Sequence, residues 1–260
     1  AAAESGRLYC LDAADGDEIW RFDAQHDDLS TPAVAGGRIW FSSSLREYSV
    51  AGGELRREDR AVLYCLDAET GKEIWKKRFP GRILAAPAVS GGRLFVGRTD
   101  RRFACVDAGT GAPLWDTPAG GAIRSSAAVA DGKVVFGSDD RCVYCLDAGS
   151  GRRLWKVDLK DVVGASPAVS GGRIFVGAAD GAMHCLDLGS GKAIWRAKAG
   201  KSVVATAAVG DGLVVAGATD GNINCWAAEN GELRWRRKIG GQVIASACLA
   251  PPRVVAPPKN

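Results

Sequence analysis

The sequence has little of what most active sites are built from. Its 260 residues include two histidines and one methionine, and no stretch approaches the roughly 18 consecutive apolar residues that a membrane helix needs. A Gly-x-Ser-x-Gly elbow, a phosphate-binding glycine loop and paired carboxylates are missing as well. No segment keeps the i, i+3, i+4, i+7 spacing of an amphipathic helix over about 10–12 residues. We therefore expect no membrane insertion and no helical fold, and nothing in the sequence assigns a catalytic residue.

Glycine is abundant, with 34 residues, and tryptophan recurs at a fixed interval. The phrase CLDAETGKEIW, from Cys65 to Trp75, has a counterpart at each repeat, and the last five of these phrases end 40 residues apart. The gap between the first two is 55 residues. The repeated tryptophans are Trp20, Trp75, Trp115, Trp155, Trp195 and Trp235. The chain therefore consists of six units of 40 residues, an insertion of 15 and about five further residues.

Each unit predicts four short β-strands separated by turn residues. In the unit that follows Trp75 these strands cover residues 85–89, 93–96 and 103–107, and the fourth begins at the next tryptophan. Gly91-Gly92 joins the first two strands because a glycine pair tolerates the positive φ of a tight hairpin. A four-stranded repeat of about 40 residues is typical of the blade of a β-propeller, whose sheet buries both faces against its neighbours.

The two ends of the chain are complementary halves of one unit. Residues 7–20 match a third and fourth strand, and residues 243–255 match a first and second strand. We therefore predict an all-β fold: a six-bladed β-propeller of four-stranded antiparallel blades, formed by a single domain over residues 1–260. Pairing of the N- and C-terminal strands would close the ring and remove its exposed sheet edges.

The repeated phrase C-x-D-x-x-T-G-K-E-x-W, from Cys65 to Trp75, resembles the tryptophan-docking motif of propellers of the pyrroloquinoline-quinone (PQQ) type. That family usually has alanine in place of the cysteine. The resemblance extends over essentially the whole chain. It implies that each tryptophan stacks on the neighbouring blade, that the aspartate caps a turn and that the glycine provides a left-handed residue. Similar repeats occur in quinoprotein dehydrogenases, in BamB-like scaffold lipoproteins, in sensor domains of bacterial kinases and in acyl-activating enzymes.

The resemblance to the dehydrogenases implies an eight-bladed ring with a vicinal cysteine pair and a Ca²⁺ site beside the quinone. This sequence has six units, no adjacent cysteines and no acidic cluster of that kind on its loops. We therefore expect no cofactor, and PQQ binding is the alternative.

Eight cysteines suggest a disulfide or metal site, but their spacing disfavours both. Equivalent points of packed sheets lie about 10 Å apart or more, whereas a disulfide needs Cα atoms within about 7 Å. Cys142 and Cys145 would point to opposite faces of a strand, and the two histidines, His26 and His184, lie in different units. We predict buried free thiols, no metal site, and a reducing, cytoplasmic location in preference to the periplasm. The thiols at one repeat position are Cys10, Cys65, Cys105, Cys145, Cys185 and Cys225.

Basic runs near Lys76 and at 234–238 fall on the predicted outer strands, where lysine and arginine discourage edge-to-edge pairing. We therefore predict no nucleic-acid binding, and we interpret the regular tryptophans as packing residues between blades. Positions that break the repeat are the better candidates for function.

The 15-residue insertion, roughly residues 44–60, lies between the second and third strands of its unit, and Arg101 and Arg141 replace Gly181 and Gly221 of later units. In a propeller these connections share one face with the connections between blades. Arginine forks suit carboxylate and phosphate groups, so this face is predicted to bind a small anionic ligand or an acidic protein partner. The alternative is a solvated loop face. The candidate residues are Arg46, Arg56, Arg57, Arg82, Arg98, Arg101, Arg102, Arg124, Arg141, His26 and Asp28.

The predicted function is that of a monomeric, non-enzymatic scaffold or ligand-sensing module. One alternative is an enzyme with its site at the mouth of the central channel, either quinone-dependent or using His26 with Asp27 or Asp28 as a base. The other is a propeller detached from a larger acyl-activating or kinase protein.

Overall fold

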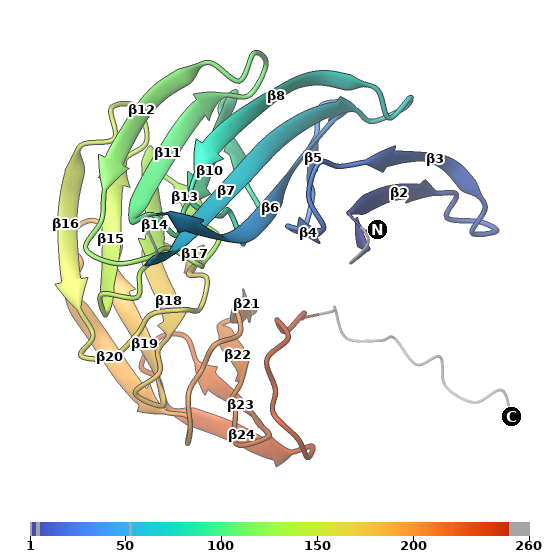
Figure 1. Ribbon diagram of the computed structural model, residues 1–260. Coiled ribbons are helices and arrows are strands. Elements are labelled where there is room, and N and C mark those ends of the chain that lie inside the picture. Colours follow the sequence, from blue (N-terminus) through green and yellow to red (C-terminus); the bar gives the residue numbers. More distant parts are fainter. Residues whose placement is uncertain (1, 4–5, 52–53, 250–260) are drawn as a thin grey trace, which may run out of the picture.

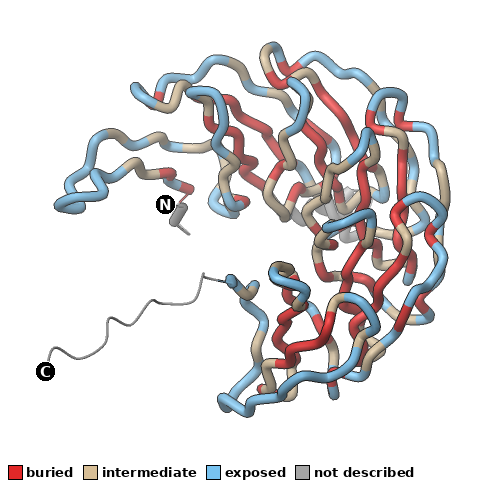
Figure 2. Tube along the Cα trace, turned by 180° about the vertical axis from the view of Figure 1, so that it is seen from behind, coloured by how far each residue is buried: buried red, intermediate tan, exposed pale blue. Residues whose placement is uncertain are grey.

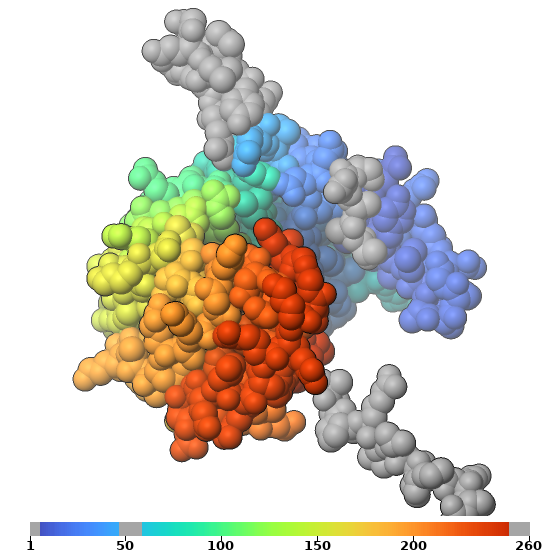
Figure 3. Space-filling view, turned by 90° about the horizontal axis from the view of Figure 1, so that it is seen from below, coloured from blue at the N-terminus to red at the C-terminus, as the bar shows by residue number. Residues whose placement is uncertain are grey.

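The computed structural model describes residues 2–3, 6–51 and 54–249, and it describes the side chains of residues 6–46 and 59–249. All elements in this part of the chain are β-strands, which form six antiparallel sheets. The sheets follow one another around an open arc (Figure 1), and the same succession is visible from below in Figure 3.

Four sheets have the four strands that the repeat predicts, and their strands pair in chain order. The first contains β9 (Ala88–Ser90), β10 (Arg93–Gly97), β11 (Arg102–Asp107) and β12 (Pro113–Pro118). The second contains β13 (Ala128–Ala130), β14 (Lys133–Gly137), β15 (Cys142–Asp147) and β16 (Arg153–Asp158). The third contains β17 (Ala168–Ser170), β18 (Arg173–Gly177), β19 (Ala182–Asp187) and β20 (Ala193–Lys198). The last contains β21 (Ala208–Gly210), β22 (Leu213–Gly217), β23 (Asn222–Ala227) and β24 (Leu233–Lys238).

The two sheets nearest the N-terminus depart from this pattern. A three-stranded sheet contains β1 (Ala2–Ala3), β2 (Arg7–Leu11) and β3 (Glu18–Asp23). A five-stranded sheet contains β4 (Asp28–Leu29), β5 (Ala33–Ala35), β6 (Arg38–Ala51), β7 (Glu54–Asp67) and β8 (Glu73–Pro80). The 15-residue insertion is therefore a continuation of β6 and β7 as a long hairpin, whereas the repeat suggested a loop. At about 3.3 Å per residue, this hairpin extends roughly 30 Å beyond the ends of the equivalent strands.

The predicted strand boundaries agree with the structure to within a few residues. The strand predicted at 85–89 is β9, which is shorter and begins at Ala88, and those predicted at 93–96 and 103–107 are β10 and β11. The fourth strand of each unit begins before its tryptophan, because the strand already pairs there with the third strand.

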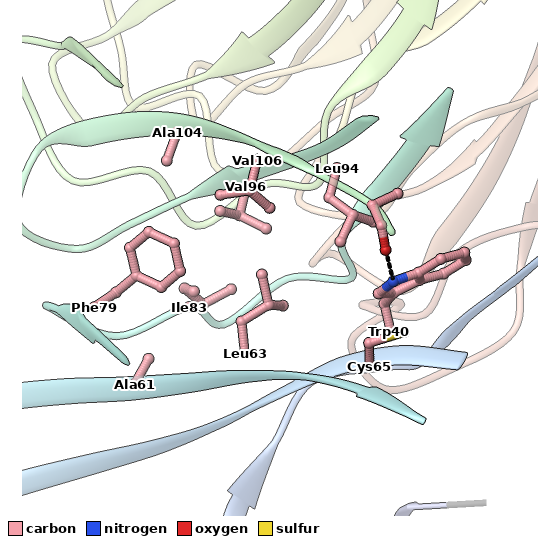
Figure 4. Close-up of a cluster of buried hydrophobic side chains, with 11 residues drawn as sticks. Trp40, Ala61, Leu63, Cys65, Phe79, Ile83, Leu94, Val96, Ala104 and Val106 are labelled. Atoms are coloured by element: carbon pink, nitrogen blue, oxygen red, sulfur yellow. Dashed lines mark hydrogen bonds between the residues drawn. The ribbon is translucent and has the colours of Figure 1, made fainter. Parts of the chain in front are cut away.

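The core lies between successive sheets, along their middle strands (Figure 2). Between the sheets of β6–β8 and β9–β12, Leu63 and Ile83 contact Leu94 and Val96 (Figure 4). Trp40 belongs to the same cluster, and its Nε1 donates to the carbonyl of Ala108 at 3.1 Å. Each sheet of the arc therefore depends on its neighbour for burial, as the amphipathic faces of isolated four-stranded sheets require.

The repeated tryptophans join neighbouring sheets. Trp115 Nε1 donates to the carbonyl of Ala148 at 3.2 Å, and Trp155 Nε1 donates to that of Leu188 at 3.1 Å. The indole lies on a glycine of the next sheet: a Cβ atom at Gly151, whose φ is +71°, would lie 2.6 Å from Cδ2 of Trp115. Only glycine combines that φ with so close an approach. The structural role that the family resemblance implied for these tryptophans is thus confirmed for the five from Trp20 to Trp195.

The two ends of the arc do not pair in the part of the chain that the structure describes. The sheet of β1–β3 takes its third strand from Ala2–Ala3, and residues 239–249 form no strand. Trp235 is 44% exposed, and a Cβ atom at Gly16 would meet no atom within 4 Å. Much of the predicted clasp falls on residues 250–260, which lie outside the described residues. Closure of the ring therefore stays a prediction.

Candidate binding face

One face of the arc, called here the loop face, combines two kinds of connection. The turns between second and third strands cover residues 98–101, 138–141, 178–181 and 218–221, and the connections between sheets cover 81–87, 119–127, 159–167 and 199–207. Backbone hydrogen bonds hold each turn against the connection before it, as from Thr99 N to the Arg82 carbonyl at 3.0 Å and from Asp139 N to the Ala122 carbonyl at 2.9 Å. The predicted arginines of the turns and those of the connections between sheets therefore lie on the same side of the arc.

Arg98 lies inside the protein and not on the loop surface. Its side chain is 2% exposed, and it donates from Nε and Nη2 to the carboxylate of Asp100 at 2.9 and 2.8 Å. Nη1 donates to Asp116 at 3.1 Å, and the guanidinium lies 5.3 Å from the centre of the Phe79 ring. Asp116 also accepts from Nε of Arg102 at 2.9 Å. Both arginines therefore neutralise carboxylates of their own sheet.

Arg82 and Arg124 are also paired with acidic residues. Arg82 Nη2 donates to Asp28, and Arg124 Nε donates to Asp139 at 2.9 Å. Burial, and after it the positive charge of Arg124, lowers the pKa of Arg82, and Nε of Arg82 has no partner among the described residues. The Asp28 carboxylate is thereby directed to an arginine, so a base formed by His26 with Asp28 is not the arrangement observed.

Arg101 and Arg141 are the two arginines of the loop face that project freely. Both are exposed, and neither side chain has a hydrogen bond or ion pair within the described ranges. Their φ angles are +67° and +71°, in the left-handed region where Gly181 and Gly221 have +75° and +82° at the same repeat position. For residues other than glycine, this backbone conformation carries a steric cost of the order of 1 kcal/mol.

The remaining predicted residues lie on or beside the long hairpin. Arg46 is exposed on β6, opposite Asp59 of β7. The side chains of Arg56 and Arg57 lie outside the described residues. His26 is half-buried, beside a cavity between the connection after β3 and the base of the hairpin.

Acidic clusters behind the loop face were not singled out from the sequence. Asp140 accepts from the Tyr144 hydroxyl at 2.6 Å and from Lys156 Nζ at 2.9 Å, and Asp180 contacts His184 and Arg196. Burial raises the pKa of Asp140, but these hydrogen bonds outweigh it and leave that pKa below its usual value. The signal was present, because one repeat position is aspartate in four units: Asp100, Asp140, Asp180 and Asp220.

The cysteines at the repeat position are buried, as predicted, except Cys10, which is partly buried, and Cys248, outside that position, is exposed. All eight thiols are free, and burial raises the pKa of Cys65, Cys105 and Cys185 to about 11 and that of Cys145 to about 12. Such thiols stay protonated at neutral pH, so they are poor nucleophiles and poor metal ligands.

The described residues do not fit a PQQ site of the dehydrogenase type. No group of three or more histidine, cysteine or acidic residues able to hold a metal ion occurs within residues 6–46 and 59–249. The first strands of the sheets, such as β9, β13 and β17, present alanine, valine and serine. No helix of the described chain has the length and apolar character needed to span a membrane.

Comparison with known proteins assigns the family. A family model described as "Outer membrane protein assembly factor BamB" matches residues 1–56, 50–141 and 138–256. The chain belongs to this family. Its repeats are therefore PQQ-like, and its fold is of the β-propeller type, as the repeated phrase predicted.

Solved structures confirm the fold at low sequence identity. BamB from Moraxella catarrhalis superposes with a TM-score of 0.74 at 19% identity, covering 91% of this chain and 68% of that one. A europium-containing methanol dehydrogenase gives 0.75 at 13% identity, covering 94% and 68%. The computationally designed Ika8 protein gives 0.69 at 17% identity, covering 96% and 86%.

A curated relative matches part of the sequence. The β-alanine-activating enzyme of Danio rerio is 30% identical over 95 residues, which are 36% of this chain and 8% of that protein. The chain thus matches only a small share of this relative's length.

Proposed function

We propose that the chain is a monomeric, non-enzymatic scaffold whose loop face binds an acidic surface of a protein partner. The observation that carries the proposal is the pair Arg101 and Arg141. Both are exposed, both lack an internal partner among the described residues, and both occupy positive-φ positions that glycine fills elsewhere in the chain. Strained backbone positions cluster at ligand-binding sites, so two such arginines on one face support a binding role.

The other loop-face arginines support the proposal indirectly. Arg82, Arg98, Arg102 and Arg124 are held by aspartates, so the arginine charge of this face that is available to a partner is that of Arg101 and Arg141, with Lys201 in a later connection and Arg46 on the neighbouring hairpin. An assembly factor, as the family is described, acts through protein contacts. The description refers to the outer membrane, so it lends no support to the cytoplasmic location that the free thiols suggested. No nucleic-acid partner is included in the proposal.

The proposed scaffold is a closed ring of six blades. In it, residues 243–255 supply the first and second strands of the blade begun by β2 and β3. Its support is a matched pair of unfilled contacts: Trp235 lacks the neighbouring glycine that the other tryptophans have, and Gly16 lacks a tryptophan. Elsewhere in the arc, each repeated tryptophan from Trp20 to Trp195 lies against the equivalent glycine of the next sheet.

The double variant Arg101→Gly/Arg141→Gly tests the binding face. Glycine suits both φ angles, so the variant keeps the fold and gains stability while losing two charges. Binding of a fluorescent glutamate-rich peptide, measured by anisotropy at low and physiological salt, should weaken at least tenfold, and a glutamine-rich peptide of the same length should not bind.

Lys160→Gly is the matched control, because Lys160 is also exposed with a φ of +73° but is paired with Asp158. It should leave the peptide affinity unchanged. Equal affinities of the double variant and the parent chain would refute the proposed face.

A second function is favoured by the match to the β-alanine-activating enzyme: the chain would be a propeller domain of a larger activating protein. An antibody against this chain should then detect a polypeptide much larger than 27.2 kDa in the source cells. A band at the mass of the chain itself would reject this second candidate.

A further inference from the structure

An open cavity of about 290 Å³ lies between the sheets of β9–β12 and β13–β16. It is on the side of the arc opposite the loop face, because turns between first and second strands and a turn between a third and a fourth strand form its lining. Phe95, Val129 and Ala148 provide apolar surface, and Arg93 and Asp131 are the charged residues of the described lining. The cavity thus combines an apolar part with one group of each charge.

In the preceding space between sheets, an indole fills this place. Trp40 pairs with Cys65 of β7 as Phe95 pairs with Cys105 of β11, so the two aromatic residues are equivalent. The larger side chain of Trp40 is buried, and its Nε1 donates to the carbonyl of Ala108 at 3.1 Å (Figure 4). The place therefore accepts a planar aromatic ring when the chain supplies one.

In the following space, a leucine fills it. Leu188 is the equivalent of Ala148, since their amides donate to the carbonyls of Gly172 and Gly132, both at 2.9 Å. Leu188 is 2% exposed and belongs to the core cluster that includes Val135. The combination of phenylalanine and alanine at the cavity provides neither the indole nor the leucine. Because protein interiors leave few such hollows, this one marks a place that a ligand can occupy.

Both charged residues of the lining have groups available to a ligand. Arg93 Nη1 donates to the carbonyl of Ala148 at 2.8 Å, and its Nε and Nη2 have no hydrogen bond within the described residues. Asp131 is exposed, and its carboxylate has no hydrogen bond or ion pair in the same part of the chain. A carboxylate suits the guanidinium, and an ammonium group suits the aspartate.

The space between the last two sheets has the same aromatic and alanine residues, but other side chains lie beside it. Arg173 donates there to the carbonyls of Ala228 and Glu229, both at 2.9 Å. Leu249 approaches this space, since a Cβ atom at Gly210 would lie 3.4 Å from Cδ1 of Leu249. This second space supplies matched control variants.

We propose that the cavity between β9–β12 and β13–β16 binds a free α-amino acid with an aromatic side chain. The carboxylate of the ligand pairs with Arg93, and its ammonium group pairs with Asp131. The ring packs on Phe95 and Val129, as the indole of Trp40 packs in the preceding space. The inference goes beyond the proposed function, because the site lies on the opposite side of the arc.

The size of the cavity sets the size of the ligand. Its 290 Å³ is about twice the roughly 150 Å³ of an apolar protein cavity that holds benzene, so a ligand of about twelve non-hydrogen atoms fits. Phenylalanine has this size and all three chemical features. Alanine carries the same two charges but leaves the apolar part of the cavity unused.

Calorimetric titration of the full chain with L-phenylalanine tests the site. Phenylalaninamide lacks the carboxylate and hydrocinnamate lacks the ammonium group, so each should bind at least tenfold more weakly, because each keeps one of the two charged contacts. Alanine should also bind at least tenfold more weakly, because it lacks the ring.

Three variants each remove one feature of the site. Arg93→Leu, which introduces the residue that Leu213 provides in the last sheet, should weaken phenylalanine binding at least tenfold. Asp131→Gly should do the same, and glycine suits its φ of +49°. Ala148→Leu should abolish binding, because the leucine fills the cavity as Leu188 fills the equivalent place.

Arg173→Leu and Asp211→Gly are the matched controls, because they make the same changes in the space between the last two sheets. Asp211 also has a positive φ, of +50°. Both variants should leave phenylalanine binding unchanged. Arg101→Gly/Arg141→Gly should also bind phenylalanine normally, so failure of the protein-binding face and failure of this site are distinguished.

Absence of phenylalanine binding, or equal binding of alanine or of either analogue, would overturn the proposal. So would an unchanged affinity of Arg93→Leu or Ala148→Leu. The comparison of ligands uses the unaltered chain, so it decides the question even where a variant loses its cooperative thermal melt.

Discussion

A buried histidine on β19 makes the stability of the molecule depend on pH. His184 is 6% exposed, and its Nε2 lies 3.1 Å from Oδ2 of Asp180, which Arg196 contacts at 2.7 Å. Burial lowers the pKa of His184 below its ordinary value of 6.5, although Asp180 acts in the opposite direction. The native state therefore favours the neutral ring.

Asparagine occupies the position of His184 in the next sheet, as Asn224. Replacing His184 by asparagine should therefore make the free energy of unfolding less dependent on pH. Between the lowered native pKa and 6.5 the unfolded chain binds more protons, so the contribution of His184 is complete above about pH 6.5 and is lost as pH falls. Urea denaturation at pH 7.5, 6.5 and 5.5 measures this loss, with His26→Asn as the control. Parallel profiles for His184→Asn and the parent chain would contradict the assignment.

At the scale of the elements, the sequence predicted the strands because each unit repeats their turn chemistry. Glycines such as Gly91 and Gly92, both with positive φ, mark the hairpins wherever the repeat is intact. The insertion at 44–60 has no counterpart in the other units, so the repeat gives no information about its structure. It continues β6 and β7 through backbone pairing between the two strands.

The same reason explains the mixed outcome for the candidate site. The charge available at Arg101 and Arg141 could be predicted, because their counterparts are glycines. The burial of Arg98 could not, since Asp116, one of its two partners, comes from a distant position of the repeat and reaches it only when β11 pairs with β12.

Shortening the hairpin should leave the fold intact. β4 and β8 pair with it no further than Ser44 and Arg60, and the Asp59 carbonyl accepts from Gly81 N at 2.8 Å, so residues 47–58 lie beyond the strand pairing of β4 and β8. Replacement of 47–58 by Asn-Gly, which forms a tight two-residue turn between Arg46 and Asp59, should shift the melting temperature by no more than about 4 °C, which corresponds to about 1 kcal/mol for a protein of this size. Circular dichroism checks this, and loss of a cooperative melt would show that the hairpin is needed for folding.

At the scale of the whole molecule, stability depends on the contacts that each sheet makes with its neighbours. Each tryptophan from Trp20 to Trp195 fastens one sheet to the next, and the contact that would involve Trp235 and Gly16 is the one left unmade in the described structure. An arc with free ends exposes apolar surface at both, as Leu11 and Ile244 show with 46% and 65% exposure.

The contribution of Trp235 to stability therefore distinguishes a closed ring from an open arc. Trp155→Ala removes a docked indole and should cost about 3–5 kcal/mol in either case. Trp235→Ala should cost a similar amount if the ring closes, but less than about 1 kcal/mol if the indole stays exposed.

Deletion of residues 246–260 should open the ring, promote aggregation and make a further Trp235→Ala change nearly neutral, while leaving the cost of Trp155→Ala unchanged. Urea denaturation of the parent chain and these five variants completes this cycle. A small cost of Trp235→Ala in the full chain, or a monomeric and cooperatively melting deletion variant, would contradict closure by the chain's own ends.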